Sequence, residues 1–246
     1  MVSIKKTVNK LTLDEKISLL TGFNSWYSNK IPRLKIPSMK MSDGPNGVRG
    51  DSTSGKSSAC FPCPISLGST WNKELINKIG IALGQEALDK DVDVLLGPTI
   101  NLHRHPLGGR HFENFSEDPV LTGEIAVAYV KGVQSKKVSA CLKHFVANDT
   151  EFERHTVSSN LDERTLREIY LLPFEMGIKK AKAKSVMSAY NKLNNIYCSS
   201  NKDLLIDILK KEWGFDGYVV SDWGAALETV DNATGGLDME MPGPGN

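Results

Sequence analysis

The sequence predicts an α/β protein of the (β/α)8 TIM-barrel type, either a regular barrel or one with some units incomplete or distorted. Three observations support this fold class. Short β-rich runs alternate with helical stretches, which is the pattern of parallel strands joined by crossover helices. Several runs are apolar throughout, as expected of strands covered on both faces. About seven or eight such units in 246 residues is the size of one barrel domain, taken as residues 1–246.

A doubly wound open sheet is the alternative fold. However, no G-x-G-x-x-G run opens a helix in this chain, which weakens a nucleotide-binding sheet of that kind. No repeated unit, low-complexity tract or long linker divides the chain either. We therefore prefer a single barrel.

The strands are expected where β-branched and apolar residues gather between turn residues. A strand in a parallel barrel ends at the mouth, so each predicted strand also predicts where its last side chains lie. In chain order the candidate strands are "SMKMSD" (38–43), "PISLG" (64–68), "DVDVLLGP" (91–98), "VSACLKHF" (138–145), "SVMSAY" (185–190), "GYVVSD" (217–222) and "GLDMEM" (236–241).

The helices between them are expected to begin at capping residues. Thr12 and Glu15 have the spacing of a capping box. Asp118 precedes a proline at a first helical turn, and Asp162 and Asn201 stand before amphipathic stretches. These four sites predict helices that begin near residues 13, 119, 163 and 202.

Two of the helices carry further signals. Gly80 and Gly84 share one face of the helix near 71–89, which predicts close approach of a neighbouring element. Pro173 predicts a kink or a break in the helix that follows Asp162. The helix after Asn201 has an apolar stripe, formed by Leu204, Leu205, Ile208 and Leu209.

Composition excludes several classes of function. Lys+Arg 30 against Asp+Glu 29 gives a net charge of +1 without a basic block, so we expect no nucleic-acid partner. No stretch is long and apolar enough to span a bilayer, and the first twenty residues lack the features of a signal peptide. We therefore expect a soluble, cytoplasmic protein that does not bind membranes.

The four cysteines also fit a reducing compartment. Cys60 and Cys63 form a C-x-x-C, but no second pair completes a zinc site and no helix is expected to open at Cys63. His103 and His105, with His111 nearby, lack a clear third ligand, and Arg104 lies between the first two. We expect neither a metal nor a cofactor.

Polar residues collect at the ends of the predicted strands. Asp43, Lys143 with His144, Tyr190 and Asp222 each end or follow an apolar run. In a parallel barrel these ends converge on one mouth, where active sites lie. The pattern therefore predicts a polar site at the carboxyl ends of the strands.

The chemistry of this mouth suits a polyhydroxylated ligand. Charged groups bind hydroxyls, and Arg110 and Glu113 are two further charged groups expected at this mouth. Trp223 offers a ring on which the apolar face of a sugar can pack. Asp222 is the candidate nucleophile because retaining glycoside hydrolysis needs a carboxylate beside the anomeric carbon. Lys143 and Arg110 are expected to keep it ionised.

Each of these residues also has an ordinary structural interpretation. An Asp after a strand is commonly a helix cap or a turn residue. Lys143 with His144 fits a solvated strand end, and Arg110 with Glu113 fits a surface ion pair. The clustering at one end of the strands favours a site, because caps and surface pairs have no reason to prefer that end.

Several ordered motifs match a known family. They are "MSDGPNGVRG", "FPCPISLGSTWN", "GPTINLHRHPLGGRHFENFSEDP", "CLKHFVANDTEFERH", "ERTLREIYLLPFE", "MSAYNKLNN" and "WGFDGYVVSDWGA". With them the chain resembles the N-terminal barrel domain of glycoside hydrolase family 3, in particular its β-glucosidase branch. The resemblance runs from about residue 10 to the end of the chain.

The resemblance implies a retaining β-glucosidase acting on terminal β-D-glucosyl residues of glucosides or oligosaccharides, with Asp222 as nucleophile. Trp223 would flank the leaving group, and Met187 and Arg49 would lie near the site. The residues implied to hold the innermost sugar are Asp43, Arg110, Lys143, His144, Arg154 and Tyr190.

The resemblance also implies a missing proton donor. β-Glucosidases of this family continue into an α/β sandwich domain that supplies a Glu as general acid/base, and nothing in this chain matches that Glu. General acid catalysis is worth roughly 10²–10⁴-fold, so the chain alone is expected to be weak or inert on ordinary glucosides. The chain would then be a truncated enzyme, one half of a split enzyme with a C-terminal partner, or a non-catalytic sugar-binding barrel.

A related branch, the β-N-acetylhexosaminidases, carries an Asp/His pair in the loop after its K-H-F motif. In this chain that loop is "VANDTEFERH", which lacks the P-G-H-G and D-S-H runs. Glu151, Glu153 or His155 as proton donor is therefore the minor alternative.

Overall fold

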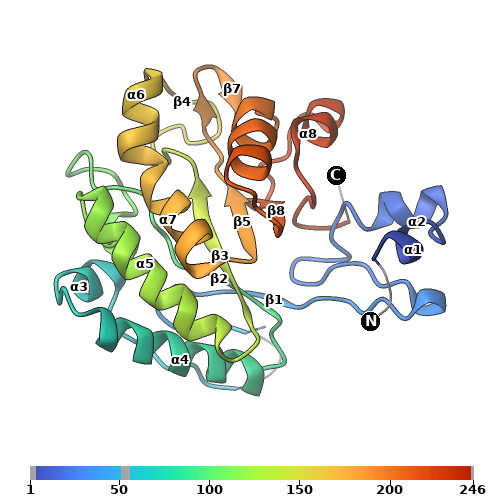
Figure 1. The fold of residues 1–246 in the computed structure, drawn as a ribbon, viewed down its shortest axis with the longest axis horizontal. Coiled ribbons are helices and arrows are strands. Elements are labelled where there is room, and N and C mark those ends of the chain that lie inside the picture. The colour runs from blue at the N-terminus through green and yellow to red at the C-terminus, as the bar shows by residue number, and fades with distance from the viewer. Residues whose placement is uncertain (1–3, 51–55, 245–246) are drawn as a thin grey trace.

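The computed structural model describes residues 4–50 and 56–244. Its main sheet has five parallel strands in the order β1-β2-β3-β5-β8, so neighbours in the sheet follow chain order. Helices α4, α5 and α7 lie on one side of this sheet, and α1 and α2 lie on the other (Figure 1). The strands are β1 (Met41–Asp43), β2 (Val94–Leu96), β3 (Ser139–Phe145), β5 (Ser185–Ser188) and β8 (Tyr218–Ser221).

The predicted α/β class is therefore correct, but the sheet forms only a curled half of a barrel. Beyond β8, pairing continues in the described residues as single bridges, from Val220 to Met239 and from Glu240 to Thr21, both parallel. Two antiparallel bridges, Gly22 to Ser28 and Tyr27 to Lys40, then lead back to β1. Antiparallel segments need no crossover helix, so this half lacks regular βα units.

Two predicted strands are wrong. Residues 64–68 form helix α3 (Pro64–Gly68), with Cys63 at its N-cap, so a helix does open at that cysteine. A short apolar run does not distinguish a buried strand from a helix, and proline at the first helical position favours the helix. The segment 236–241 makes only the single bridges of Met239 and Glu240.

The predicted helix starts are confirmed. The Thr12 hydroxyl accepts from the Glu15 amide while the Glu15 carboxylate accepts from the Thr12 amide, which is a complete capping box. Asp118, Asp162 and Asn201 each accept a hydrogen bond from an amide in the first turn that follows. The helices concerned are α2 (Leu13–Ser18), α5 (Pro119–Gln134), α6 (Glu163–Thr165) and the π-helical η4 (Asp203–Glu212).

The helix after Asp162 is interrupted, as Pro173 predicts. It continues as a π-helical segment, η3 (Leu166–Tyr170), and then as α7 (Leu172–Ala181), with Pro173 in the first turn. The remaining elements are α1 (Ile4–Val8), η1 (Pro32–Leu34), α4 (Lys73–Asp89), η2 (His111–Glu113), β4 (Ser158–Ser159), β6 (Lys192–Leu193), β7 (Ile196–Tyr197) and α8 (Thr229–Gly235). Strands β4, β6 and β7 form a separate small sheet.

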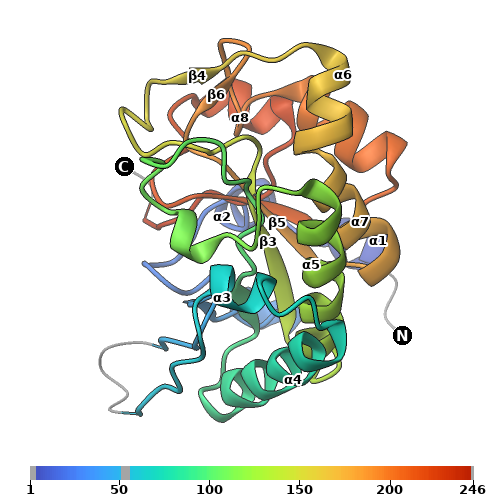
Figure 2. The ribbon, with the colours of Figure 1, turned by 90° about the vertical axis from the view of Figure 1, so that its left-hand side faces the viewer.

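The core lies mainly between the sheet and its covering helices, where α4 packs on α5 (Figure 2). A Cβ at Gly80 would lie 2.5 Å from the Tyr129 carbonyl oxygen, so this glycine permits the close approach. A smaller cluster fills the concave side of the sheet and includes Met41, Leu96, Met187 and Val220. No helix within the described residues is long and apolar enough to cross a membrane.

Candidate active site

The carboxyl ends of the five strands surround a small pocket of about 210 Å³. Nine of the residues predicted for the site line it, whereas Arg49 and Glu113 line a neighbouring pocket. Trp26 and Leu96 line it as well, and the sequence did not single out either of them. The lining is Trp26, Asp43, Leu96, Arg110, Lys143, His144, Arg154, Met187, Tyr190, Asp222 and Trp223.

Asp222 lies at the end of β8 and is buried. Its Oδ1 accepts from the Trp223 amide at 2.8 Å, while its Oδ2 has no hydrogen-bond partner. Burial raises the pKa of this carboxyl, and the charges of Lys143 and Arg110 oppose that rise without cancelling it. The cations thus favour the ionised form, as predicted, but less strongly than burial disfavours it.

Asp43 and Lys143 form an ion pair at the floor of the pocket. Lys143 Nζ donates to Asp43 Oδ1 at 2.9 Å, and the lysine side chain is only 4% exposed. Burial alone would raise the pKa of Asp43, but the Lys143 charge and hydrogen bond outweigh it and lower that pKa. Arg49 lies 3.4 Å from Asp43 Oδ2, is largely exposed and lines a neighbouring pocket. Lys143 is therefore not a solvated strand end.

Two carboxylates hold the two arginines of the site. Arg110 Nε donates to Glu113 Oε1 at 2.5 Å, and Glu113 Oε2 accepts from Thr99 at 3.0 Å. Glu151 Oε2 accepts from Arg154 Nη1 at 2.8 Å, and its Oε1 lies 3.8 Å from Arg110 Nη1. Glu113 is buried, so the pair with Arg110 is not the surface ion pair of the alternative interpretation. Glu151 thus forms ion pairs with both arginines and is absent from the pocket lining.

His144 and Tyr190 complete the polar wall. His144 Nε2 lies 3.4 Å from Asp222 Oδ2, but burial, together with the nearby Arg110 and other cations, holds the pKa of the imidazole well below its usual value. The contact therefore joins a neutral imidazole to a carboxyl group. Tyr190 donates to the Trp223 carbonyl at 2.9 Å, and the Arg154 guanidinium lies 4.5 Å from the centroid of the Tyr190 ring.

An aromatic wall closes one side of the pocket. The rings of Trp26 and Trp223 lie 5.4 Å apart, centroid to centroid, and Trp223 Nε1 donates to the Ser25 carbonyl at 2.9 Å. Trp26 precedes β1 in a segment without strand or helix periodicity. Only the fold brings it to the site, and no local pattern in the sequence indicates it.

The histidines of the segment 103–111 make hydrogen bonds with backbone groups. His103 Nε2 lies 2.9 Å from the His111 carbonyl oxygen and 3.1 Å from that of Asn114. His111 Nε2 lies 2.5 Å from the His105 carbonyl oxygen. Over the ranges 4–50 and 56–244 no group of three or more His, Cys, Asp or Glu is arranged to hold a metal. The four cysteines are all free.

Comparison with known proteins agrees with this geometry. The family model described as the glycosyl hydrolase family 3 N-terminal domain matches residues 11–239. The chain belongs to this family.

Relatives and solved structures give the extent of the similarity. The chain is 55% identical to a β-glucosidase of Rhizobium radiobacter over 243 residues, which is 98% of this chain and 30% of that protein. A crystal structure of β-glucosidase from Kluyveromyces marxianus in complex with glucose matches 100% of this chain with a TM-score of 0.98 and 45% identity, and 30% of that chain is covered. β-Glucosidase 3B from Thermotoga neapolitana, in complex with glucose, matches 98% of this chain and 36% of its own at a TM-score of 0.94 and 45% identity. The family 3 chain described here thus spans about a third of these relatives.

The two carboxyl groups that line the pocket of this family 3 chain differ in their partners. Asp43 is tied to Lys143, whereas Asp222 presents an unpartnered oxygen to the cavity. Cations line the same cavity, so it can bind an electron-rich, hydroxylated ligand and orient it over Asp222.

Proposed function

We propose that this family 3 chain is the nucleophile-bearing domain of a retaining β-glucosidase. The observation that carries the proposal is the buried Asp222 Oδ2, which has no partner in a pocket lined by Lys143, Arg110 and Arg154. The similar structures from Thermotoga neapolitana and Kluyveromyces marxianus are complexes with glucose, which supports a glucosyl unit as the ligand. The pocket, at about 210 Å³, suits a single sugar ring better than a longer chain.

The proposed reaction has two displacements. Asp222 Oδ2 attacks the anomeric carbon, a C–O bond forms, and the bond to the leaving-group oxygen breaks as that oxygen takes a proton. Water then attacks the same carbon, loses a proton to a general base and releases Asp222. Lys143 and Arg110 stabilise the carboxylate before attack and as it leaves.

We propose that the proton donor comes from outside the pocket described here. Of the residues that line it, only Asp43 and Asp222 are carboxylates, and Lys143 holds Asp43 ionised. The similar proteins are about three times as long as this chain, so a further domain or a partner chain can supply the acid.

We also propose that the segments joined by single bridges beyond β8 complete a distorted barrel. A cytoplasmic location stays a prediction from the sequence.

A mechanism-based fluorosugar tests the proposal. We expect a 2-fluoro-glucosyl fluoride, whose leaving group needs little protonation, to form a stable ester on Asp222 that peptide mass spectrometry locates. Asp222→Asn should remove the label, and glucose should compete with it. Labelling at another residue would contradict the nucleophile assignment.

The same experiment examines the non-catalytic alternative, a sugar-binding barrel. That alternative predicts that glucose binds, that the fluorosugar leaves no label even when the missing part of a relative is added, and that Asp222→Asn still binds glucose. Such a result would replace the hydrolase by a binding function.

A further inference from the structure

Asn101 does not line the pocket but makes hydrogen bonds with His144, which does. It lies in the segment that follows β2, it is 3% exposed, and its side chain makes hydrogen bonds with both backbone groups of His144. Asn101 Nδ2 donates to the His144 carbonyl oxygen at 2.9 Å, and the His144 amide donates to Asn101 Oδ1 at 2.9 Å. These two bonds determine the orientation of the amide, because its oxygen must face N–H and its nitrogen must face C=O.

That orientation determines the position of the imidazole proton. Asn101 Oδ1 also lies 3.2 Å from His144 Nδ1. An amide oxygen can only accept, so Nδ1 must carry the hydrogen. A neutral imidazole has one N–H, and Nε2 is therefore an acceptor without a hydrogen.

The charges around His144 keep it in this neutral state. Arg110 faces it from the loop before η2, Lys143 adjoins it on β3, and Arg154 faces it from the loop after β3. Asp222 faces it from the end of β8. Burial and the three cations hold the pKa of His144 well below its usual value.

The result is a pair of acceptors without a hydrogen between them. His144 Nε2 and Asp222 Oδ2 lie 3.4 Å apart, and Oδ2 has no partner. Two acceptors at this distance repel, and a hydroxyl that donates to one of them relieves the cost of leaving buried acceptors unpaired.

We infer that Asn101 is a positioning residue: it fixes the Nδ1–H tautomer of His144, so that Nε2 accepts a hydrogen bond from a ligand hydroxyl next to Asp222. The tautomer follows from contacts within the chain alone. The hydroxyl ligand rests on the proposed function.

Nitrogen NMR on the whole chain tests the tautomer. With ¹⁵N-labelled histidine, His144 is assigned by the loss of its signals in His144→Gln. We expect Nε2 of His144 to show the downfield shift of an unprotonated ring nitrogen and Nδ1 the upfield shift of a protonated one. A protonated Nε2 in the unaltered chain would overturn the inference, whatever the chain binds.

Two substitutions at Asn101 should change the tautomer in stated ways. Asn101→Asp places a carboxylate at Nδ1–H, which favours the imidazolium and protonates Nε2. Asn101→Ala removes the acceptor for Nδ1, so the proton moves to Nε2 and faces Asp222. Both should weaken glucose binding about tenfold, the value of one lost hydrogen bond.

The matched controls are Asn191→Asp and Asn191→Ala. Asn191 is 1% exposed, and its side-chain nitrogen donates to the Val146 carbonyl at 3.1 Å, so the same atoms are lost from a buried amide that does not contact His144. These controls should leave the His144 nitrogen shifts unchanged. Equal changes in the Asn191 and Asn101 series would contradict a specific role of Asn101.

The outcomes separate this inference from the proposed function. If Nε2 is unprotonated in the unaltered chain and becomes protonated in the Asn101 variants, but the chain does not bind glucose, the role of Asn101 is supported and the proposed glucose site is contradicted. Glucose binding that is unaffected when Nε2 becomes protonated overturns the hydroxyl contact.

Discussion

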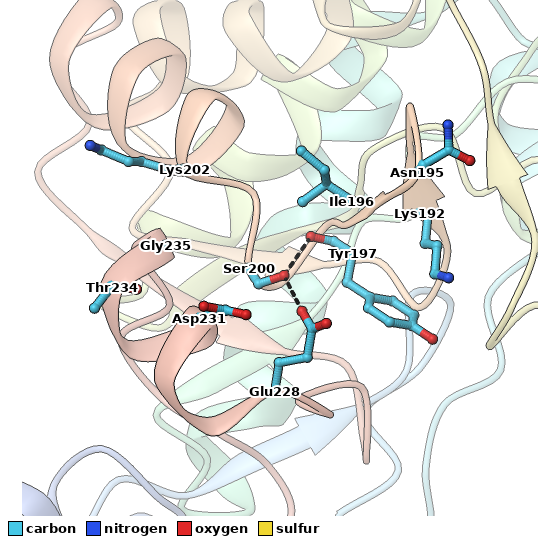
Figure 3. A pocket seen from close by; sticks show the side chains of 10 residues that line it. All are labelled: Lys192, Asn195, Ile196, Tyr197, Ser200, Lys202, Glu228, Asp231, Thr234 and Gly235. Atoms are coloured by element: carbon cyan, nitrogen blue, oxygen red, sulfur yellow. Dashed lines mark hydrogen bonds between the residues drawn. The ribbon is translucent and has the colours of Figure 1, made fainter.

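Two pockets of this chain differ in size and in the state of their polar groups. The pocket of Figure 3 has a volume of about 560 Å³, against about 210 Å³ at the strand ends. Its lining includes Lys192, Lys202, Glu228 and Asp231, so charge alone does not distinguish the two.

The difference lies in whether the polar groups are already satisfied. In the larger pocket Ser200 donates to Glu228 at 2.7 Å, and the Lys192 ammonium lies 4.7 Å from the centroid of the Tyr197 ring (Figure 3). Among the described residues, none of those lining it has a buried polar atom without a partner. Asp222 Oδ2 in the smaller pocket does lack one. An unpaired buried carboxylate is costly unless a ligand compensates it, so this feature indicates the site better than volume does.

The largest expected effect separates the two pockets by activity. We expect Asp222→Asn to slow the release of dinitrophenolate from a dinitrophenyl glucoside by about 10⁴-fold or more, because it removes the nucleophile. Glu228→Gln, in the pocket of Figure 3, should change the rate by less than about twofold, as expected of a residue without a part in the chemistry. Equal losses in both variants would remove the distinction between the pockets.

The next effect concerns the buried cation of the smaller pocket. Lys143→Met leaves Asp43 and Asp222 without their neighbouring ammonium, so the free energy of unfolding should fall by about 3 kcal/mol. Urea denaturation measures this change, and calorimetry should show glucose binding about 100-fold weaker, on the order of 3 kcal/mol. Lys202→Met, at an exposed position of the larger pocket, should change neither quantity appreciably.

A smaller effect is expected where one carboxylate only orients an arginine. Glu113→Gln turns the charge-assisted bond to Arg110 Nε into a neutral one, and glucose binding should weaken about tenfold. The exposed Glu117→Gln, four residues along, is the matched control and should bind like the unaltered chain. Unchanged binding in Glu113→Gln would show that Arg110 is oriented by other contacts.

A pH dependence of stability is also expected, from a residue that lines neither of the two pockets. Burial raises the pKa of Asp149 to about 6, against the opposing effects of the Leu102 amide, Arg104 and Tyr170. The folded chain therefore binds this proton more tightly than the unfolded chain, and stability should fall as the pH rises from about 4 to about 6.

Asp149→Asn should abolish the loss of stability that Asp149 causes as the pH rises. Urea denaturation at a series of pH values measures this loss. Thr234→Ala, at an exposed position of the Figure 3 pocket, should retain the pH profile of the unaltered chain. A profile that does not differ between Asp149→Asn and the unaltered chain would contradict the raised pKa of Asp149.

Much of the fold could be predicted because its signals are local. Thr12, Asp118, Asp162 and Asn201 cap helices through bonds within one turn, and such bonds need no distant partner. Five of the seven predicted strands pair in the sheet. They could also be recognised locally, because strands buried on both faces are apolar, β-rich runs. Residues 64–68 form a helix instead of the predicted strand, since a run of five residues is too short to show a clear period.

The side chains at the mouth could be predicted from their positions along the chain. A residue at the carboxyl end of a parallel strand reaches that edge whatever surrounds it, which is why Asp43, Lys143, His144, Tyr190 and Asp222 meet in one pocket.

The burial, the hydrogen-bond partners and the protonation of these groups depend instead on the folded chain. One half of the sheet is irregular because it is built from segments near both ends of the chain. These segments pair only through single bridges. Trp26 reaches the pocket from before β1, and Asn101 meets His144 from the segment beside it. Burial, partner and proton position depend on which distant segments pack against a side chain, and those contacts exist only in the folded chain.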